Sequence, residues 1–202
     1  MVLGITGNIA SGKSRIARLF GELGAAVVSA DLLAREAVAP GSGALRQIVD
    51  RFGRGVLLAD GELNRAALGQ LVFADPVARR DLEAITHPAI ADLAVRRLAA
   101  LRAEGPPLIV YEAPLLYEAG AEDRVDRVLV VTVDPKVQLA RLMARDQLDA
   151  SAARQRIEAQ LPQDLKAARA DYVIDNSGRW QDCAAQVRAL YERVRREGKG
   201  EG

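Results

Sequence analysis

The feature that most constrains this chain is a glycine-rich stretch near its N-terminus, Gly7-Asn8-Ile9-Ala10-Ser11-Gly12-Lys13-Ser14. It follows the pattern G-x-x-x-x-G-K-S, in which backbone amides and a lysine surround nucleotide phosphates. Apolar residues before it predict a buried strand, and apolar residues at helical spacing follow it. A strand, this loop and a helix in succession form the context that the motif requires. That context argues against the alternative, a chance match in a glycine-rich turn.

The chemistry expected of this stretch, called the phosphate loop below (residues 7–14), is nucleotide binding. Inward-turned amides and the helix N-terminus attract an anion. Lys13 is expected at the β- and γ-phosphates of ATP, and the Ser14 hydroxyl is expected to bind Mg²⁺. The residues predicted to bind the nucleotide here are Asn8, Ile9, Ala10, Ser11, Gly12, Lys13, Ser14 and Arg15.

Four further apolar segments predict strands, at residues 26–31, 108–112, 128–133 and 172–174. Continuous apolar runs favour a parallel sheet buried on both faces. Together with the strand before the phosphate loop, they predict an α/β protein. We expect a P-loop NTPase fold with a five-stranded parallel sheet flanked by helices.

Two acidic residues follow predicted strands, where ligands of open α/β sheets gather. Asp31 comes after the second strand and could accept a proton from an attacking hydroxyl or order the waters of a metal. It could also cap the helix expected after it, and the two roles are compatible, although its position and charge favour the catalytic one. Glu112 ends the third strand, and an apolar strand ending in an acid is the arrangement that orders Mg²⁺ or its waters.

The segment from residue 32 to residue 102 is predicted to be almost entirely helical, too long for a simple crossover. We expect a helical lobe that carries the acceptor, with helices near 45–52, 65–73, 77–85 and 89–101 and Asn64 as an N-cap. His87, the only histidine, would lie at a helix junction before Pro88. From the residues alone, a structural role is favoured for it.

Residues 136–165 predict a charged helical segment in which Gln138, Arg141 and Arg145 share one helix face. One interpretation is a lid whose guanidinium groups close over the triphosphate. The other is a solvated basic face. Asn176 follows the fifth strand, where it could contact a base or simply form a turn.

Composition limits the remaining classes of function. The 202 residues carry a net charge of +1 and one cysteine, Cys183. We therefore expect no nucleic-acid partner and no intrachain disulfide. No apolar run approaches the length of a membrane span, and nothing suggests secretion, so a cytoplasmic location is expected.

Along nearly its whole length the chain resembles the dephospho-coenzyme A kinase family. The matching stretches include the phosphate loop, Ala30-Asp31-Leu32-Leu33-Ala34-Arg35, Thr86-His87-Pro88, Pro114-Leu115-Leu116-Tyr117-Glu118, and Gln138 with Arg141 and Arg145. The resemblance implies that ATP phosphorylates the ribose 3′-hydroxyl of dephospho-coenzyme A. The expected partners are these two small molecules, and the expected assembly is a monomer or a weak homo-oligomer.

The resemblance also implies an assignment of parts and residues. The nucleotide-binding core would comprise residues 1–31, 103–135 and 166–202, with an acceptor domain at 32–102 and a lid at 136–165. Lys13, Asp31, Arg141 and Arg145 would be catalytic, and Asn176 would bind the nucleotide. Asp31, Arg65, His87, Glu112 and Leu115 would bind the acceptor. Ser14 would bind Mg²⁺, with Glu112 reaching the metal through water.

Four positions depart from the usual pattern of this family. Ala10 stands where glycine is usual, which predicts that the loop needs no strongly positive φ there. Arg15 replaces a threonine, Ser29 replaces the first acid of an Asp-x-Asp pair, and Glu112 replaces an aspartate.

Two other classes of function stay open from the sequence. One is a nucleoside or nucleoside-monophosphate kinase on the same scaffold. The other is a nucleotide-dependent switch, although the guanine-reading Asn-Lys-x-Asp of a GTPase is absent from the sequence.

Overall fold

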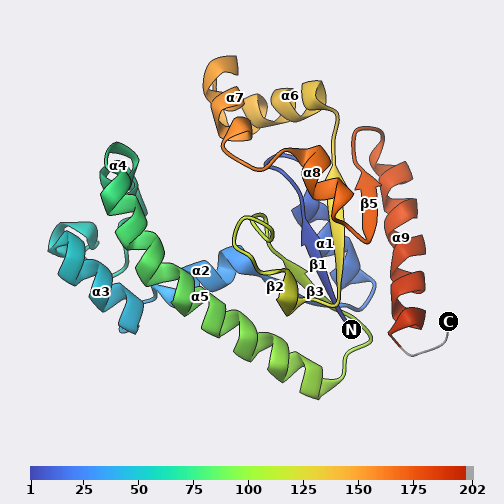
Figure 1. Ribbon diagram of the computed structural model, residues 1–202, viewed down its shortest axis with the longest axis horizontal. Coiled ribbons are helices and arrows are strands. Elements are labelled where there is room, and N and C mark those ends of the chain that lie inside the picture. The colour runs from blue at the N-terminus through green and yellow to red at the C-terminus, as the bar shows by residue number, and fades with distance from the viewer. Residues whose placement is uncertain (199–202) are drawn as a thin grey trace. The chain divides into compact units, whose positions relative to one another are not determined.

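The computed structural model describes residues 1–198 and contains a five-stranded sheet flanked by helices (Figure 1). The strands are β1 (Val2–Thr6), β2 (Ala26–Ser29), β3 (Ile109–Glu112), β4 (Arg127–Thr132) and β5 (Tyr172–Asp175). Their order is β2-β3-β1-β4-β5, and every neighbouring pair is parallel. The predicted α/β fold with a parallel sheet is therefore confirmed.

The central position of β1 explains its composition. It pairs with β3 on one side and β4 on the other, and all five of its residues are buried. A strand covered on both faces needs apolar side chains throughout, as the run Val2-Leu3-Gly4-Ile5 provides. The main apolar core forms where α1 (Lys13–Glu22) and α9 (Trp180–Glu197) pack on the sheet, with Phe20 and Val187 among its fully buried residues.

The chain divides into two compact units. The core unit comprises Met1–Ser29 and the chain from Leu98 onward, and the helical unit comprises Ala30–Arg97. The core unit carries α1 (Lys13–Glu22), η2 (Glu122–Arg124), α6 (Pro135–Asp146), α7 (Ala150–Glu158), α8 (Gln163–Ala168) and α9 (Trp180–Glu197).

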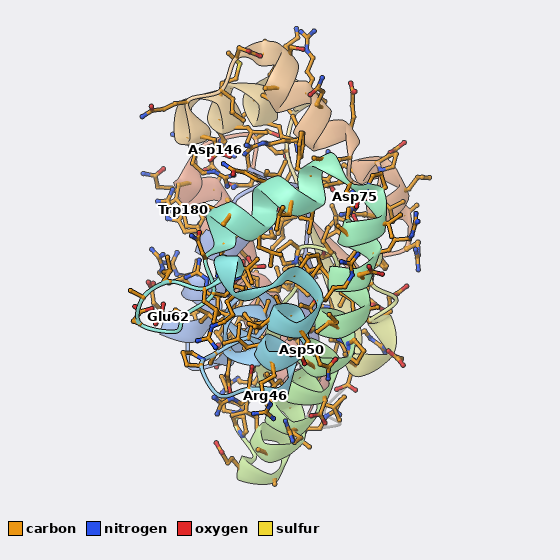
Figure 2. The ribbon with its side chains drawn as sticks, turned by 90° about the vertical axis from the view of Figure 1, so that its left-hand side faces the viewer. Arg46, Asp50, Glu62, Asp75, Asp146 and Trp180 are labelled. Carbon is orange, nitrogen blue, oxygen red and sulfur yellow. The ribbon has the colours of Figure 1, made fainter. Side chains whose placement is uncertain are left out.

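The helical unit is built from α2 (Ala30–Ala37), α3 (Gly43–Phe52), η1 (Arg54–Val56), α4 (Arg65–Ala74) and most of α5 (Pro76–Glu104). Its own small core includes Ile48, Val56 and Leu68, with Leu82 and Ile85 of α5 packed against it. Figure 2 shows the side chains of this unit, with Arg46 and Asp50 exposed on α3.

The structure corrects one expectation about this unit. Two helices with a junction at His87 were predicted, whereas α5 is a single helix that contains Pro88. Proline removes one backbone donor and crowds the preceding turn, at a cost of about 3 kcal/mol. Leu82, Ile85 and Ala89, on both sides of the proline, all pack on the same core, so burial holds the helix together. Thr86 Oγ1 donates to the carbonyl of Leu82 at 2.9 Å.

Within the described residues, no helix combines the length and the apolar character needed to cross a membrane.

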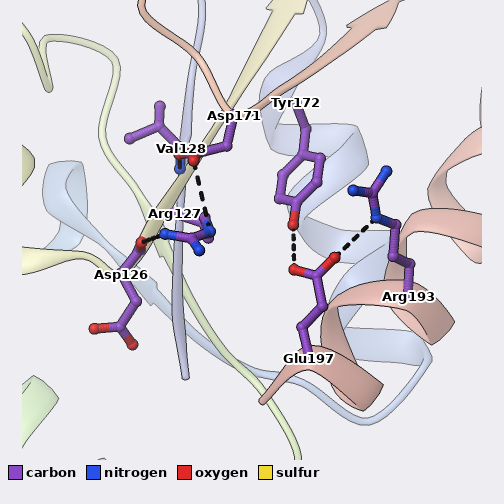
Figure 3. A network of polar contacts seen from close by, with 7 residues as sticks. All are labelled: Asp126, Arg127, Val128, Asp171, Tyr172, Arg193 and Glu197. Carbon is purple, nitrogen blue, oxygen red and sulfur yellow. Dashed lines mark hydrogen bonds and ion pairs between the residues drawn. The ribbon is translucent and has the colours of Figure 1, made fainter. Parts of the chain in front are cut away.

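Acidic side chains receive the amides at the beginning of two strands. The amide of Val2 donates to Asp126 Oδ2 at 2.6 Å, and the amide of Val128 donates to Asp171 Oδ2 at 2.8 Å. Figure 3 shows the surrounding polar network, in which Arg127 contacts Asp171. These carboxylates satisfy donors that the strand pairing leaves over.

The same network fastens the end of α9 to β5. The Tyr172 hydroxyl donates to Glu197 Oε2 at 2.5 Å, and Arg193 Nε donates to Oε1 of the same carboxylate at 2.8 Å (Figure 3). Partial burial, followed by the hydrogen bond to Glu197, raises the pKa of the Tyr172 phenol above its ordinary value of 10.0. The hydrogen bond from Tyr172, with that from Arg193, lowers the pKa of Glu197.

We expect Tyr172→Phe to be less stable than the wild type at neutral pH by about 1 kcal/mol, the usual net value of one hydrogen bond. Because the pKa of Tyr172 is higher in the folded protein, unfolding is increasingly favoured as the pH rises past 10.0. The stability difference between the two proteins should therefore shrink above that pH. Urea unfolding at a series of alkaline pH values measures it, and a difference independent of pH would contradict the assignment.

Candidate active site

Two glycines of the phosphate loop sit where no side chain would fit. A Cβ on Gly7 would lie 2.5 Å from the carbonyl oxygen of Val131, and a Cβ on Gly12 would lie 2.2 Å from Asn176 Nδ2. Gly12 also has φ of +89°, a left-handed conformation that glycine adopts readily. The loop backbone is thus pressed against the end of β4 and the turn after β5.

The conformation of Ala10 differs from the prediction. Its φ is +61°, so the expectation that this position avoids a positive φ is wrong. The amide of Ser11 donates to the carbonyl of Asn8 at 3.1 Å, which closes a four-residue turn over Ile9 and Ala10. A positive φ at the third residue is characteristic of a type II turn, which usually has glycine there. The alanine therefore carries backbone strain of about 1–2 kcal/mol.

The strand register brings a hydroxyl and a carboxylate together beside this loop. Glu112, at the end of β3, pairs with Ile5 of β1, immediately before the phosphate loop. Ser14, in the first turn of α1, donates its hydroxyl to Glu112 Oε1 at 2.5 Å. The two predicted metal-site residues are therefore adjacent.

These two oxygens suit a magnesium ion, which prefers hard oxygen ligands and few protein groups. Within residues 1–198, no cluster of three or more His, Cys, Asp or Glu residues could hold a metal by itself. A metal at Ser14 and Glu112 would therefore need phosphate and water oxygens to complete its coordination.

Asn176 contacts the phosphate loop directly. Its side chain is buried, and Nδ2 donates to the carbonyl of Ser11 at 2.8 Å. Ser11 is itself buried, and its hydroxyl faces Gly7. A contact between Asn176 and the nucleotide stays a prediction.

Arg15, predicted to bind the nucleotide, lies on the chain's only tryptophan. Its guanidinium carbon is 3.7 Å from the centroid of the Trp180 ring, a cation–π arrangement. Burial raises the pKa of the nearby Cys183 thiol, while the charges of Arg15 and Arg141 act in the opposite direction. Arg15 therefore lies at the beginning of α9, which starts at Trp180.

The predicted lid consists of α6, α7 and the segment after them. Arg145 Nε donates to Asp146 Oδ1 at 2.7 Å, and Arg156 donates to Oδ2 of the same carboxylate at 2.9 Å (Asp146 is labelled in Figure 2). The hydrogen bond from Arg145 is the main reason that the pKa of Asp146 is lowered. Gln138, expected on one face with Arg141 and Arg145, is buried and turns toward Ile9.

The predicted acceptor residues are divided between the units. Asp31, Arg65 and His87 belong to the helical unit, whereas Glu112 and Leu115 belong to the core unit. Asp31 is exposed in the first turn of α2, which begins at Ala30, so Asp31 is not the N-cap. His87 is exposed within α5, and Leu115 is half exposed.

Arg65 opens α4 within the helical unit. The Asn64 side chain before it accepts from the amide of Ala67 at 3.0 Å, which confirms the predicted cap. Arg65 lines a hollow of about 370 Å³ whose other lining residues include a second arginine, one acid and several apolar side chains, among them Arg35, Glu62 and Leu63. A basic side chain beside apolar ones suits a ligand that carries both phosphate and uncharged parts.

Sequence reasoning assigned no role to a buried ion pair in the core unit. Lys166 Nζ lies 2.7 Å from Glu118 Oε1, and the lysine side chain is 0% exposed. Lys166 is one of only four lysines in a chain in which arginine is far more common. That rarity was the available signal.

The strand, phosphate loop and helix, together with the hydroxyl–carboxylate pair, define a P-loop kinase. The sequence profile of the dephospho-CoA kinase family matches residues 1–182. The chain therefore belongs to the dephospho-CoA kinase family.

Individual relatives agree with this membership. The dephospho-CoA kinase of Syntrophotalea carbinolica is 57% identical over 96% of this chain and 92% of its own, and that of Geobacter sulfurreducens is 55% identical over 94% and 96%. Among solved structures, dephospho-CoA kinase from Campylobacter jejuni has a TM-score of 0.77 at 28% identity, covering 98% of both chains. TT1252 from Thermus thermophilus has a TM-score of 0.78 at 34% identity, covering 96% of this chain and 97% of its own.

The left-handed conformation of Ala10 generates a stability prediction. Ala10→Gly should leave the free energy of unfolding unchanged or raise it by up to about 1 kcal/mol, because relief of strain offsets the added freedom of the unfolded chain. The matched control, Ala17→Gly in the buried face of α1, should lose about 1 kcal/mol or more. Urea titration measures both, and equal losses would contradict the strained turn.

Proposed function

We propose that this chain transfers the γ-phosphoryl group of ATP to the ribose 3′-hydroxyl of dephospho-coenzyme A, giving coenzyme A and ADP. The observation that carries the proposal is the Ser14–Glu112 contact beside the phosphate loop, in a chain that belongs to the dephospho-CoA kinase family. A bond forms between the ribose 3′-oxygen and the γ-phosphorus of ATP. The bond between the γ-phosphorus and the oxygen that bridges it to the β-phosphorus breaks, which releases ADP, and a base accepts the hydroxyl proton.

On the donor side, the amides of residues 11–14 and the Lys13 ammonium would hold the phosphates of ATP. Asn8, Ile9, Ala10, Arg15 and Asn176 would form the rest of the nucleotide site. Ser14 would bind Mg²⁺ directly, with Glu112 acting through water. When bound, the metal supplies positive charge to the phosphate oxygens.

On the acceptor side, Asp31 would orient the 3′-hydroxyl and take its proton. Arg65, His87, Glu112 and Leu115 would bind dephospho-coenzyme A, and the exposed Arg65 borders a hollow that suits such a ligand. Arg141 and Arg145 would neutralise charge on the migrating phosphoryl group and exclude water. Asp146 holds Arg145 through two hydrogen bonds, which limits the directions that its guanidinium can take.

We also infer that the protein is cytoplasmic and that it is a monomer or a weak homo-oligomer. Its partners would be the two small-molecule substrates, ATP and dephospho-coenzyme A.

A coupled assay of ADP release tests the acceptor. Dephospho-coenzyme A should support turnover, whereas nucleosides and nucleoside monophosphates should not. Turnover with a nucleoside acceptor would favour the alternative small-molecule kinase, and ATP hydrolysis without any acceptor would favour a switch.

Lys13→Ala should lower kcat by about 10²-fold or more, because the compact charge stabilises the transferring phosphoryl group. Its thermal unfolding should stay close to that of the wild type. Lys136→Ala, which changes an exposed lysine of α6, is the matched control and should keep normal turnover. Near-normal phosphorylation by Lys13→Ala would overturn the donor assignment.

Asp31→Asn should lower kcat by about 10²- to 10⁴-fold, the range usual for removal of a general base. The amide keeps the size of the carboxylate, so the dissociation constant for dephospho-coenzyme A, measured by calorimetry, should change little. Unchanged turnover would reduce Asp31 to a charge in the first turn of α2. A large loss of acceptor binding would instead make it a binding residue.

A further inference from the structure

The backbone of Ile9 in the phosphate loop is bound by two glutamine side chains. Its amide donates to Gln160 Oε1 at 2.7 Å, and its carbonyl accepts from Gln138 Nε2 at 2.8 Å. A glutamine amide offers both a donor and an acceptor, so each side chain can take the role that the backbone leaves open. Both polar groups of one loop residue are thereby satisfied from outside the loop.

The carbonyl contact determines which way the loop turns. The peptide between Ile9 and Ala10 is the central one of the turn closed by Asn8 and Ser11. Because a trans peptide is planar, its carbonyl and its N–H point in opposite directions. By holding the Ile9 carbonyl, Gln138 directs the Ala10 amide to the other side and requires the positive φ seen at Ala10. The opposite peptide orientation would relieve the strain of the alanine.

The two glutamines come from the two ends of the lid. Gln138 lies in the first turns of α6 and is only 4% exposed, and Gln160 follows the end of α7. The backbone of Ile9 is therefore hydrogen-bonded to both the beginning and the end of this helical segment. Strained backbone of this kind persists only where its surroundings hold it firmly.

The segment that carries Gln160 is itself anchored. Asn8 Nδ2 donates to the carbonyl of Leu161 at 3.1 Å, and the amide of Leu161 donates to Glu118 Oε1 at 3.2 Å. Glu118 in turn receives the buried ammonium of Lys166.

A second amide side chain fixes the same segment to the sheet. Gln163 accepts from the amide of Val133 at 2.8 Å and donates to its carbonyl at 3.1 Å. Gln160 is thus presented to the phosphate loop from a rigid support.

We propose that Gln138 and Gln160 are positioning residues of the nucleotide site, which hold the Ile9–Ala10 turn so that the phosphate loop keeps its anion-binding form. This inference rests on the proposed function only in taking the ligand to be a nucleotide with a phosphate tail. Neither glutamine needs to touch the nucleotide to act in this way.

Substitution by glutamate should have opposite effects at the two positions, because Gln160 accepts a hydrogen bond from Ile9 whereas Gln138 donates one to it. Gln160→Glu keeps an acceptor for the Ile9 amide, whereas Gln160→Met has none. Gln138→Glu loses the donor and places a carboxylate against the Ile9 carbonyl. Gln155→Met, at an exposed position of α7, is the matched control.

The first measurement is hydrogen exchange of the Ile9 amide without nucleotide. The Ile9 amide should exchange on the order of tenfold faster in Gln160→Met, and at the wild-type rate in Gln160→Glu and Gln155→Met. Wild-type protection in Gln160→Met would overturn the inference.

The second measurement is the dissociation constant for ADP, obtained by calorimetry without acceptor. Gln160→Met and Gln138→Glu should bind ADP on the order of tenfold more weakly, while Gln155→Met binds it normally. Normal ADP affinity in both would overturn the inference. Thermal unfolding of each variant is recorded. If Gln138→Glu does not fold, the two variants of the half-buried Gln160, Gln160→Met and Gln160→Glu, decide the question alone.

The outcomes separate this inference from the proposed function. A protein whose ADP affinity depends on Gln160, but which does not phosphorylate dephospho-coenzyme A, contradicts the proposed reaction alone. A protein that phosphorylates dephospho-coenzyme A, while its Gln160→Met variant keeps normal ADP affinity and normal exchange at Ile9, contradicts the positioning role alone.

Discussion

The close approach of the phosphate loop to the ends of β4 and β5 is the constraint on which the rest of the site depends. Gly7 lies against the carbonyl of Val131, and Gly12 lies against the Asn176 side chain, with no space for a methyl group at either position. This contact brings the loop within reach of Asn176, and the pairing of β1 with β3 brings Glu112 beside Ser14. Close packing of the loop backbone, against backbone at Gly7 and against a side chain at Gly12, thus fixes where the polar groups can lie.

The parts of the fold that are local in sequence could be predicted from it. The apolar runs correctly predicted the strands of the parallel sheet, and the position of Asn64 before a helical pattern correctly predicted a helix cap. The helix through Pro88 could not be predicted, because burial on both sides of the proline outweighs its local preference. The positive φ of Ala10 escaped prediction because the peptide before it is held by a contact between Ile9 and Gln138, which lie 129 residues apart.

Side-chain amides have a particular importance in the core unit. Gln138, Gln160, Gln163 and Asn176 each form hydrogen bonds with backbone groups rather than with charged side chains. Sequence patterns identify glutamine poorly, since an uncharged polar residue on a helix is usually solvated. An amide also leaves the local charge unchanged, so it can brace the loop without opposing the phosphates that the site is built to hold. Arginines of the lid, by contrast, form ion pairs with an acidic side chain, as Arg145 and Arg156 do with Asp146.

The central position of β1 has a consequence for how the protein is made. β1 is synthesised before its two partners β3 and β4, which follow only after the whole helical unit. The loop that follows it needs Leu161 and Asn176, which lie 153 and 165 residues farther along the chain. The nucleotide-binding motif is therefore synthesised long before the residues that complete its pocket, so a bound nucleotide cannot assist folding until residue 176 has been made.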